Sequence, residues 1–336
     1  MISVVISAYN AKRYLGACVD SILDNDMTEA RILIVDDGST DGSSRICDAF
    51  MAKHADVQAI HRENGGSPAA RNTGVAAIGK PNPDSWVWFV DSDDVVAPGA
   101  MGALRRLVSE TDADAVYFGY VPFDDGNEPD WTSEQSIERK TLSREMFLSG
   151  TYSFQYDHYL WRFLFRSTAL ERFVAWRVEH GMTGLCDESY SLLEDLVFIE
   201  EIMQGACESV EIVPDVLYGY RQIGTSMSRA TSPKAADSAL RAVRYIDQFN
   251  VAEMDWLPKQ CMQIALLFNA YRAAGQSKDA SGLRIDIKTE IEERVRRIGG
   301  VFALPRRLII RYLALKTGLG DLVLHRRGRM LRAEEK

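Results

Sequence analysis

The sequence has no apolar run that approaches the ~18 residues of a membrane-spanning helix, and no charged segment followed by an apolar core at its N-terminus. We therefore expect a cytoplasmic protein. Its five cysteines are odd in number and form no CxxC pair, which is typical of reduced thiols rather than a disulfide framework. The chain also lacks an excess of positive charge. A formal net charge of -9 argues against nucleic acid as a partner.

The basic residues that are present gather near the C-terminus. Residues 301–332 contain eight of them against one acid, Asp321. A helix is predicted to begin at Pro305, where arginines accompany an apolar face. Such a helix can lie on an anionic membrane surface, and it is equally compatible with a docking face for protein, including a second copy of the chain in a homo-oligomer.

Short apolar runs alternate with helical spacing over the first 120 residues. Alternation of this kind predicts an α/β fold with a mostly parallel sheet flanked by helices. The expected strands cover residues 2–8, 31–35, 57–60, 86–90 and 115–120, and a later run at 213–221 is predicted to be an edge strand. The pattern is helical after Pro233. We expect an α/β domain over residues 1–230 and a helical C-terminal region over 231–336.

The run at 86–90 changes abruptly from apolar residues to the carboxylates of Asp91, Asp93 and Asp94. Ligands of open α/β sheets gather at the carboxyl ends of parallel strands. Crowded carboxylates repel one another unless a cation relieves them, and their hard oxygens suit Mg²⁺ or Mn²⁺ carrying a phosphorylated substrate. A plain acidic turn before Pro98, which satisfies its own backbone, is the alternative.

Two further motifs follow predicted strands. The first is Asp36-Asp37-Gly38-Ser39-Thr40-Asp41, and the second is a glycine turn that feeds a helix at Pro68. Arg71 lies one turn inside that helix, where an anion could meet both the helix N-terminus and a guanidinium. A solvated arginine on the helix surface is the alternative.

These motifs, with the N-terminal Val-Ile-Ser-Ala-Tyr-Asn, resemble the family 2 glycosyltransferases of GT-A fold that build bacterial surface polysaccharides and exopolysaccharides. The resemblance implies an inverting transfer of a sugar from a nucleotide-diphosphate donor, with a UDP-sugar favoured. It assigns residues 1–120 to the donor half and 121–230 to the acceptor half. It also assigns Ser7, Tyr9 and Asp37 to the nucleobase and ribose, Arg71 to the base or diphosphate, and Asp91 and Asp93 to the metal.

The second half of the chain supplies candidates for a base and a diphosphate clamp. Glu194 and Asp195 stand near a predicted helix start, where acids are favourable even without a function. The resemblance implies that Asp195 deprotonates the acceptor and that Glu194 supports it. Arg221 and Ser226 match a segment that closes over the donor phosphates, although a polar loop is the alternative.

An aromatic segment lies between these motifs. Trp161 is compatible with both an acceptor-facing and a core position, and Phe163 stands where the family often has a lysine.

The resemblance as a whole implies a metal-dependent glycosyltransferase with a saccharide or lipid-linked saccharide acceptor, working peripherally at the inner face of the cytoplasmic membrane. A catalytically silent sugar-nucleotide-binding module is one alternative. A nucleotidyltransferase is another, but the sequence has no glycine-rich loop with an arginine and a lysine after the first strand.

Overall fold

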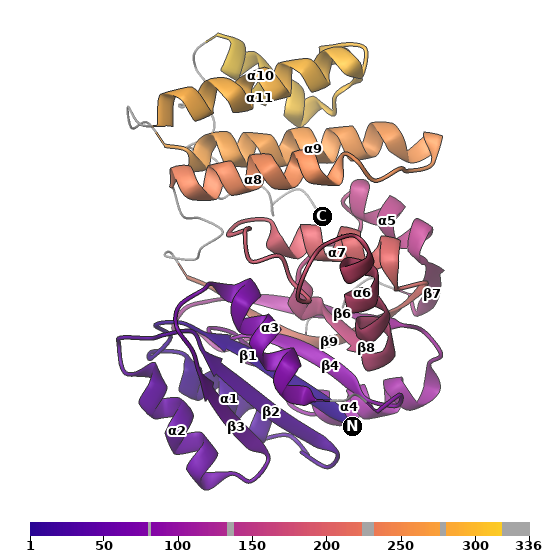
Figure 1. Cartoon of the computed structure of the whole chain (residues 1–336). Helices are drawn as coiled ribbons and strands as arrows, with labels where there is room; N and C mark the ends of the chain where they lie inside the picture. The colour runs from indigo at the N-terminus through magenta and orange to yellow at the C-terminus, as the bar shows by residue number, and fades with distance from the viewer. Residues whose placement is uncertain (80–81, 133–137, 224–231, 276–279, 318–336) are drawn as a thin grey trace. The chain divides into compact units, whose positions relative to one another are not determined.

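A computed structural model describes residues 1–79, 82–132, 138–223, 232–275 and 280–317 (Figure 1). The chain divides into two compact units. The first consists of residues 1–147, 158–189 and 194–224, and the second of residues 148–157, 190–193 and 225–336.

The first unit is a sheet flanked by helices, as the alternating pattern predicts. Its strands are β1 (Ile2–Ala8), β2 (Ala30–Asp36), β3 (Val57–His61), β4 (Trp86–Asp91), β5 (Val95–Val96), β6 (Ala115–Asp124), β7 (Lys140–Ser143), β8 (Phe163–Arg166) and β9 (Ser209–Gln222). Its helices are α1 (Leu15–Leu23), α2 (Ser43–Lys53), α3 (Ser67–Ile78), α4 (Ala100–Glu110), α6 (Ser167–Glu179) and α7 (Glu194–Gly205), with the short 3-10 helix η1 (Leu160–Arg162).

The N-terminal strands form a parallel block in the order β3-β2-β1-β4. β1 is at its centre and is buried on both faces, as expected for a strand inside a covered parallel sheet. The register pairs Ser7 with Asp91 on one side, and on the other it pairs Ala8 with Asp36. Strand ends that carry the predicted motifs therefore meet at one edge of the sheet.

The remaining strands make the sheet mixed. β8 runs antiparallel between β4 and β6, β9 runs parallel to β6, and β5 and β7 pair antiparallel with β9. The prediction of an edge strand at 213–221 is wrong, because β9 lies between β6 and β5. Pro214 falls between residues 209–212, which pair with β7, and residues 218–219, which pair with β5, so no ladder bond is lost there.

Helix α3 packs closely on the parallel block. A Cβ at Gly74 would lie 2.4 Å from Val5 Cγ1 and 3.3 Å from Val35 Cγ2, so only glycine fits this approach. The helix begins with Pro68 in its first turn, where a missing N–H costs nothing. This packing fixes the position of Arg71, which is one turn earlier on the same helix.

The second unit is helical, as predicted, and contains α8 (Pro233–Ile246), α9 (Glu253–Ala273), α10 (Ser281–Arg297), the 3-10 helix η4 (Val301–Ala303) and α11 (Arg306–Lys316), while α5 (Arg144–Tyr152) runs from the first unit into it. Helices α8 and α9 lie side by side (Figure 1). Arg294 of α10 is buried, and its side chain donates to Glu290 on the same helix, to Asp247 at the end of α8 and to Gln263 of α9. No helix in the described part of the chain is long and apolar enough to cross a bilayer.

Candidate active site

The acidic residues after β4 divide into two kinds. Asp94 is buried, and its carboxylate accepts hydrogen bonds from the Tyr218 hydroxyl at 2.8 Å and from the Arg221 N–H at 2.6 Å. Burial, together with the nearby Asp93 and Asp91 carboxylates, raises the pKa of Asp94 well above its usual value. The same Tyr218 hydroxyl accepts the N–H of Asp91 at 3.1 Å. Asp94 therefore ties the acidic turn to β9.

Asp91 and Asp93 are the half-buried members of this turn. Burial raises the pKa of Asp91 to about 7, against the opposing effect of Arg71, and Asp93 and Asp195 add to the rise. Burial also raises the pKa of Asp93. Within the described residues, the Asp93 carboxylate accepts no hydrogen bond from another side chain. Both groups would be stabilised in their charged form by a cation.

The donor set fits Mg²⁺ or Mn²⁺ that is shared with a phosphorylated ligand. Two carboxylates with substrate phosphates and water are a usual Mg²⁺ environment. Among the residues that the structure describes, no group of three or more His, Cys, Asp or Glu side chains is placed to hold an ion without such a ligand.

Arg71 connects the acidic turn to the start of α7. Its side chain is buried, with 4% of the residue exposed, so the alternative of a solvated arginine is wrong. Nη1 donates to Asp195 Oδ1 at 2.7 Å, and Nη2 lies 3.4 Å from Asp91 Oδ1. These carboxylates, with Glu194, raise the pKa of Arg71 although its burial acts in the opposite direction.

Asp195 is held from a second direction by the backbone of η1. Its Oδ2 accepts the Leu160 N–H at 3.0 Å, while Oδ1 accepts Arg71. A carboxylate held at both oxygens has one orientation, as a general base requires. Burial and the adjacent Asp195 carboxylate raise the pKa of Glu194 to about 7. The two neighbouring acids therefore differ in environment: Asp195 accepts hydrogen bonds at both oxygens, whereas Glu194 is dominated by burial.

The residues predicted for the nucleobase lie at the ends of β1 and β2. Ser7 Oγ is 3.4 Å from Ser67 Oγ, and Tyr9 is 53% exposed. The Asp37 carboxylate is buried, where it pairs with Arg62 and accepts the Gly66 N–H at 2.7 Å. Asp37 thus stabilises, through its hydrogen bond with Gly66, the turn that leads into α3. Its assignment to the nucleobase remains a prediction.

Arg221 lies against the acidic turn. Its Nε donates to the Asp93 carbonyl at 2.8 Å, and its guanidinium stacks over the rings of Tyr14 and Phe123. Nη1 is 3.7 Å from Asp125 Oδ1. Ser226, the other residue predicted to clamp the diphosphate, lies outside the described residues.

Asn72 was missed by sequence reasoning. Its Oδ1 accepts the N–H groups of Leu185 and Cys186 at 2.9 and 2.7 Å, and its Nδ2 donates to the Cys186 carbonyl at 3.0 Å and to Glu188 Oε1 at 2.9 Å. It therefore fixes the 184–188 loop to the helix that carries Arg71. Its place beside Arg71 in the predicted motif was the available signal.

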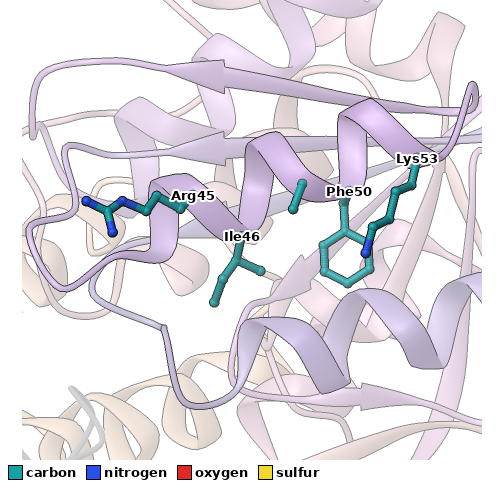
Figure 2. Close-up of a pocket in the computed structure, with 5 residues that line it drawn as sticks. Arg45, Ile46, Phe50 and Lys53 are labelled. Carbon is teal, nitrogen blue, oxygen red and sulfur yellow. The ribbon is translucent and has the colours of Figure 1, made fainter.

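Trp161 occupies a core position, with 3% of the residue exposed, and its carbonyl accepts Trp88 Nε1–H at 2.9 Å. The acceptor-facing alternative is wrong for this residue. Elsewhere in the first unit, α2 carries a shallow hollow (Figure 2), which contains none of the predicted site residues. It is lined by Arg45, Ile46, Ala49, Phe50 and Lys53.

Comparisons with known proteins agree with the predicted resemblance. Residues 3–175 match the model of glycosyl transferase family 2. Glycosyltransferase GlyG of Streptococcus pneumoniae is 42% identical over 130 residues, which are 38% of this chain and 42% of GlyG. The uncharacterized glycosyltransferase EpsJ of Bacillus subtilis is 26% identical over 243 residues, which are 72% of this chain and 67% of EpsJ. The chain thus spans less than half the length of GlyG and about two thirds of EpsJ.

Solved structures confirm the fold class. Staphylococcus aureus TarS 1-349 in complex with UDP-GlcNAc superposes with a TM-score of 0.62 at 17% identity, covering 97% of this chain and 89% of that one. The mannosyltransferase PcManGT of Pyrobaculum calidifontis, in complex with GDP-Man and Mn²⁺, gives a TM-score of 0.52 at 14% identity, covering 98% and 87%. The expected GT-A architecture with C-terminal helices is confirmed, and the match over half of the sequence shows that the chain belongs to glycosyl transferase family 2.

Proposed function

We propose that this protein is an inverting, metal-dependent glycosyltransferase that moves a sugar from a nucleotide-diphosphate donor to a saccharide acceptor in bacterial polysaccharide synthesis. One observation carries the proposal: a single buried guanidinium, that of Arg71, joins the candidate base Asp195 to the candidate metal ligand Asp91. The TarS complex contains UDP-GlcNAc, which favours a UDP-sugar as the donor.

These positions support the following reaction. Asp91 and Asp93 would hold Mg²⁺ or Mn²⁺, which would supply positive charge to the diphosphate leaving group. Asp195 takes the proton of the acceptor hydroxyl while the oxygen forms its bond to the anomeric carbon. The electron pair of the broken bond leaves with the nucleoside diphosphate. Arg71 and the Leu160 N–H keep the Asp195 carboxylate oriented, and Arg221 supports the turn that carries Asp93.

We further propose a lipid-linked acceptor and a peripheral position at the inner face of the cytoplasmic membrane. The support is a surface on α11 and η4 that combines apolar and basic residues. Phe302 is 93% exposed, and Arg306, Ile310 and Leu313 are exposed along one stripe of α11. Such surfaces bind anionic lipid through apolar burial and charge together. We also propose that the chain consists of an α/β domain over residues 1–230, which would carry the reaction, and a helical region over residues 231–336, which would carry this surface.

The test is a screen of nucleotide sugars with a saccharide acceptor, in the presence and absence of Mg²⁺ or Mn²⁺, for release of free nucleoside diphosphate. We expect metal-dependent release and a product whose anomeric configuration is opposite to that of the donor. Asp195→Asn should keep donor affinity and lower turnover by ~10²–10⁴, the usual contribution of a general base. Glu179→Gln, an exposed acid at the end of α6, is the matched control and should behave as wild type.

Each alternative gives a different result. A silent binding module would bind the donor without releasing nucleoside diphosphate. A nucleotidyltransferase would also release none, but with added pyrophosphate it would convert the nucleotide sugar to nucleoside triphosphate and sugar 1-phosphate. A product that retains the donor configuration would refute the single displacement, and near-normal turnover in Asp195→Asn would move the base elsewhere.

A further inference from the structure

Four aromatic side chains form a row of nearly parallel rings beside the candidate active site. We call Tyr218, Trp161, Tyr220 and Tyr159 the ring row. Trp161 stacks on Tyr218 at 4.4 Å between centroids, on Tyr159 at 5.2 Å and on Tyr220 at 5.5 Å, with interplanar angles of 6–11°. Tyr120 braces Trp161 edge-on at 4.9 Å.

The ring row runs from the core to the surface. Tyr218 is fully buried, whereas Tyr159 is 39% exposed. Tyr159 belongs to the segment in which sequence reasoning singled out Trp161, but it is the tyrosine, two positions earlier, that reaches solvent. Stacking on Trp161 leaves the Tyr159 ring few orientations. Binding of a ligand to this ring therefore costs little of the side-chain entropy of Tyr159.

Both ends of the ring row are tied to the candidate catalytic groups. At the buried end, the Tyr218 hydroxyl bridges Asp94 and the Asp91 N–H. At the exposed end, the residue after Tyr159 is Leu160, whose N–H holds Asp195. The position of the exposed ring is therefore fixed relative to the candidate base.

The chemistry of such a surface matches a sugar ring. A pyranose presents C–H groups on its faces and hydroxyls at its rim, and an aromatic face binds the C–H side while the rim stays hydrated. Tyrosine also offers a hydroxyl to a sugar hydroxyl. A ring beside the base would place the acceptor hydroxyl, not the donor phosphate, near Asp195.

We propose that Tyr159, presented by the ring row, is the platform on which the pyranose ring of the acceptor saccharide stacks. This inference rests on the proposed function, because it names where the acceptor of that reaction binds.

The kinetic test compares Tyr159→Ala with Tyr159→Phe. We expect Tyr159→Ala to raise KM for the saccharide acceptor by about tenfold, as loss of an aromatic contact does. Donor hydrolysis, which uses water as acceptor, should stay within about twofold. Tyr159→Phe keeps the ring and should retain most of the acceptor affinity. Trp256→Ala removes an aromatic side chain that is similarly exposed, at 38%, and should change neither quantity.

A binding test separates this inference from the proposed function. Saturation-transfer NMR with methyl β-D-glucopyranoside and methyl N-acetyl-β-D-glucosaminide should show contact with wild type and loss of contact in Tyr159→Ala. If no sugar transfer is found but these contacts are, the proposed function fails, while Tyr159 remains a platform that binds a saccharide. If acceptor KM is unchanged in Tyr159→Ala, or if wild type contacts neither glycoside, the platform is wrong.

Discussion

Arg71 donates to Asp195 at 2.7 Å and lies 3.4 Å from Asp91, so one buried guanidinium joins two carboxylates that are 104 positions apart in the chain. Gly74, one turn later, holds the helix against β1 so closely that a methyl group would not fit. The candidate base and the first candidate metal ligand are therefore both in contact with one side chain of α3, and we expect their spacing to depend on Arg71.

The first prediction concerns the fork geometry of Arg71. Lysine keeps the charge but has no planar fork, so Arg71→Lys cannot contact both carboxylates in the same way. We expect turnover to fall by about 10², the cost of a small misplacement of reacting groups. The Arg71→Lys change should add little to Asp195→Asn, because both act on one contact. Arg45→Lys on the outer helix α2 is the control (Figure 2), and full activity in Arg71→Lys would show that the fork is dispensable.

The second prediction separates Asp93 from Asp94. Asp93→Asn should leave the free energy of unfolding within ~0.5 kcal/mol of wild type, because this carboxylate has no side-chain partner to lose among the described residues. It should abolish metal-dependent donor binding. Asp94→Asn should instead cost about 1–3 kcal/mol of stability, because Tyr218 and Arg221 donate to different oxygens of Asp94 and an amide has only one oxygen.

Denaturant unfolding and donor titration with and without Mn²⁺ measure the two effects. If Asp93→Asn keeps metal-stimulated donor affinity, the assignment of Asp93 to the metal is wrong. If Asp94→Asn is as stable as wild type, the turn is held by other contacts.

The third prediction concerns pH and follows from the pKa of Asp91, which burial raises to about 7. An unfolded aspartate has a pKa of about 3.9, so between these values the folded state binds a proton that the unfolded chain does not. The contribution of Asp91 to the free energy of unfolding therefore decreases as pH rises from about 4 to 7. Without divalent metal, the free energy of unfolding of Asp91→Asn should therefore increase relative to that of wild type as pH rises over this range.

Added Mg²⁺ provides the complementary measurement. Together with a nucleoside diphosphate, which supplies the phosphate ligands, it should stabilise wild type above pH 7, where Asp91 is charged, and this stabilisation should fade below about pH 6 as protons compete for the carboxylate. Asp91→Asn should show neither effect. A stability difference between the two proteins that does not change with pH would contradict the prediction.

Local pattern was sufficient to predict the parallel block. The apolar runs at β1, β2 and β4 and the polar residues after them are properties of adjacent residues, and parallel pairing then brings those ends together. β8 could not be predicted in the same way, since a four-residue antiparallel strand gains its place from neighbours on both sides.

The candidate site was predictable as a set of residues but not as a set of contacts. The pairing of Arg71 with Asp195 and the anchoring of the 184–188 loop by Asn72 join segments more than 100 positions apart. The choice between Trp161 and Tyr159 as the exposed ring depends on which face of the segment packs on β4 and β9. No local period encodes that choice.

The last prediction tests the surface formed by η4 and α11. Phe302 and Arg306 are both exposed there, and a lysine or arginine at an anionic bilayer contributes ~1 kcal/mol. The unsubstituted protein should sediment with vesicles containing phosphatidylglycerol but not with pure phosphatidylcholine, and added salt should weaken this binding by screening. The double variant Phe302→Ser, Arg306→Glu should bind the anionic vesicles at least about tenfold more weakly, because it removes apolar burial and reverses a charge.

Arg45→Glu makes the same charge reversal on α2 and should bind as wild type. If the unsubstituted protein does not bind anionic vesicles at low salt, the membrane proposal fails. A change of oligomeric state in the double variant would then identify this surface as a contact between copies of the chain.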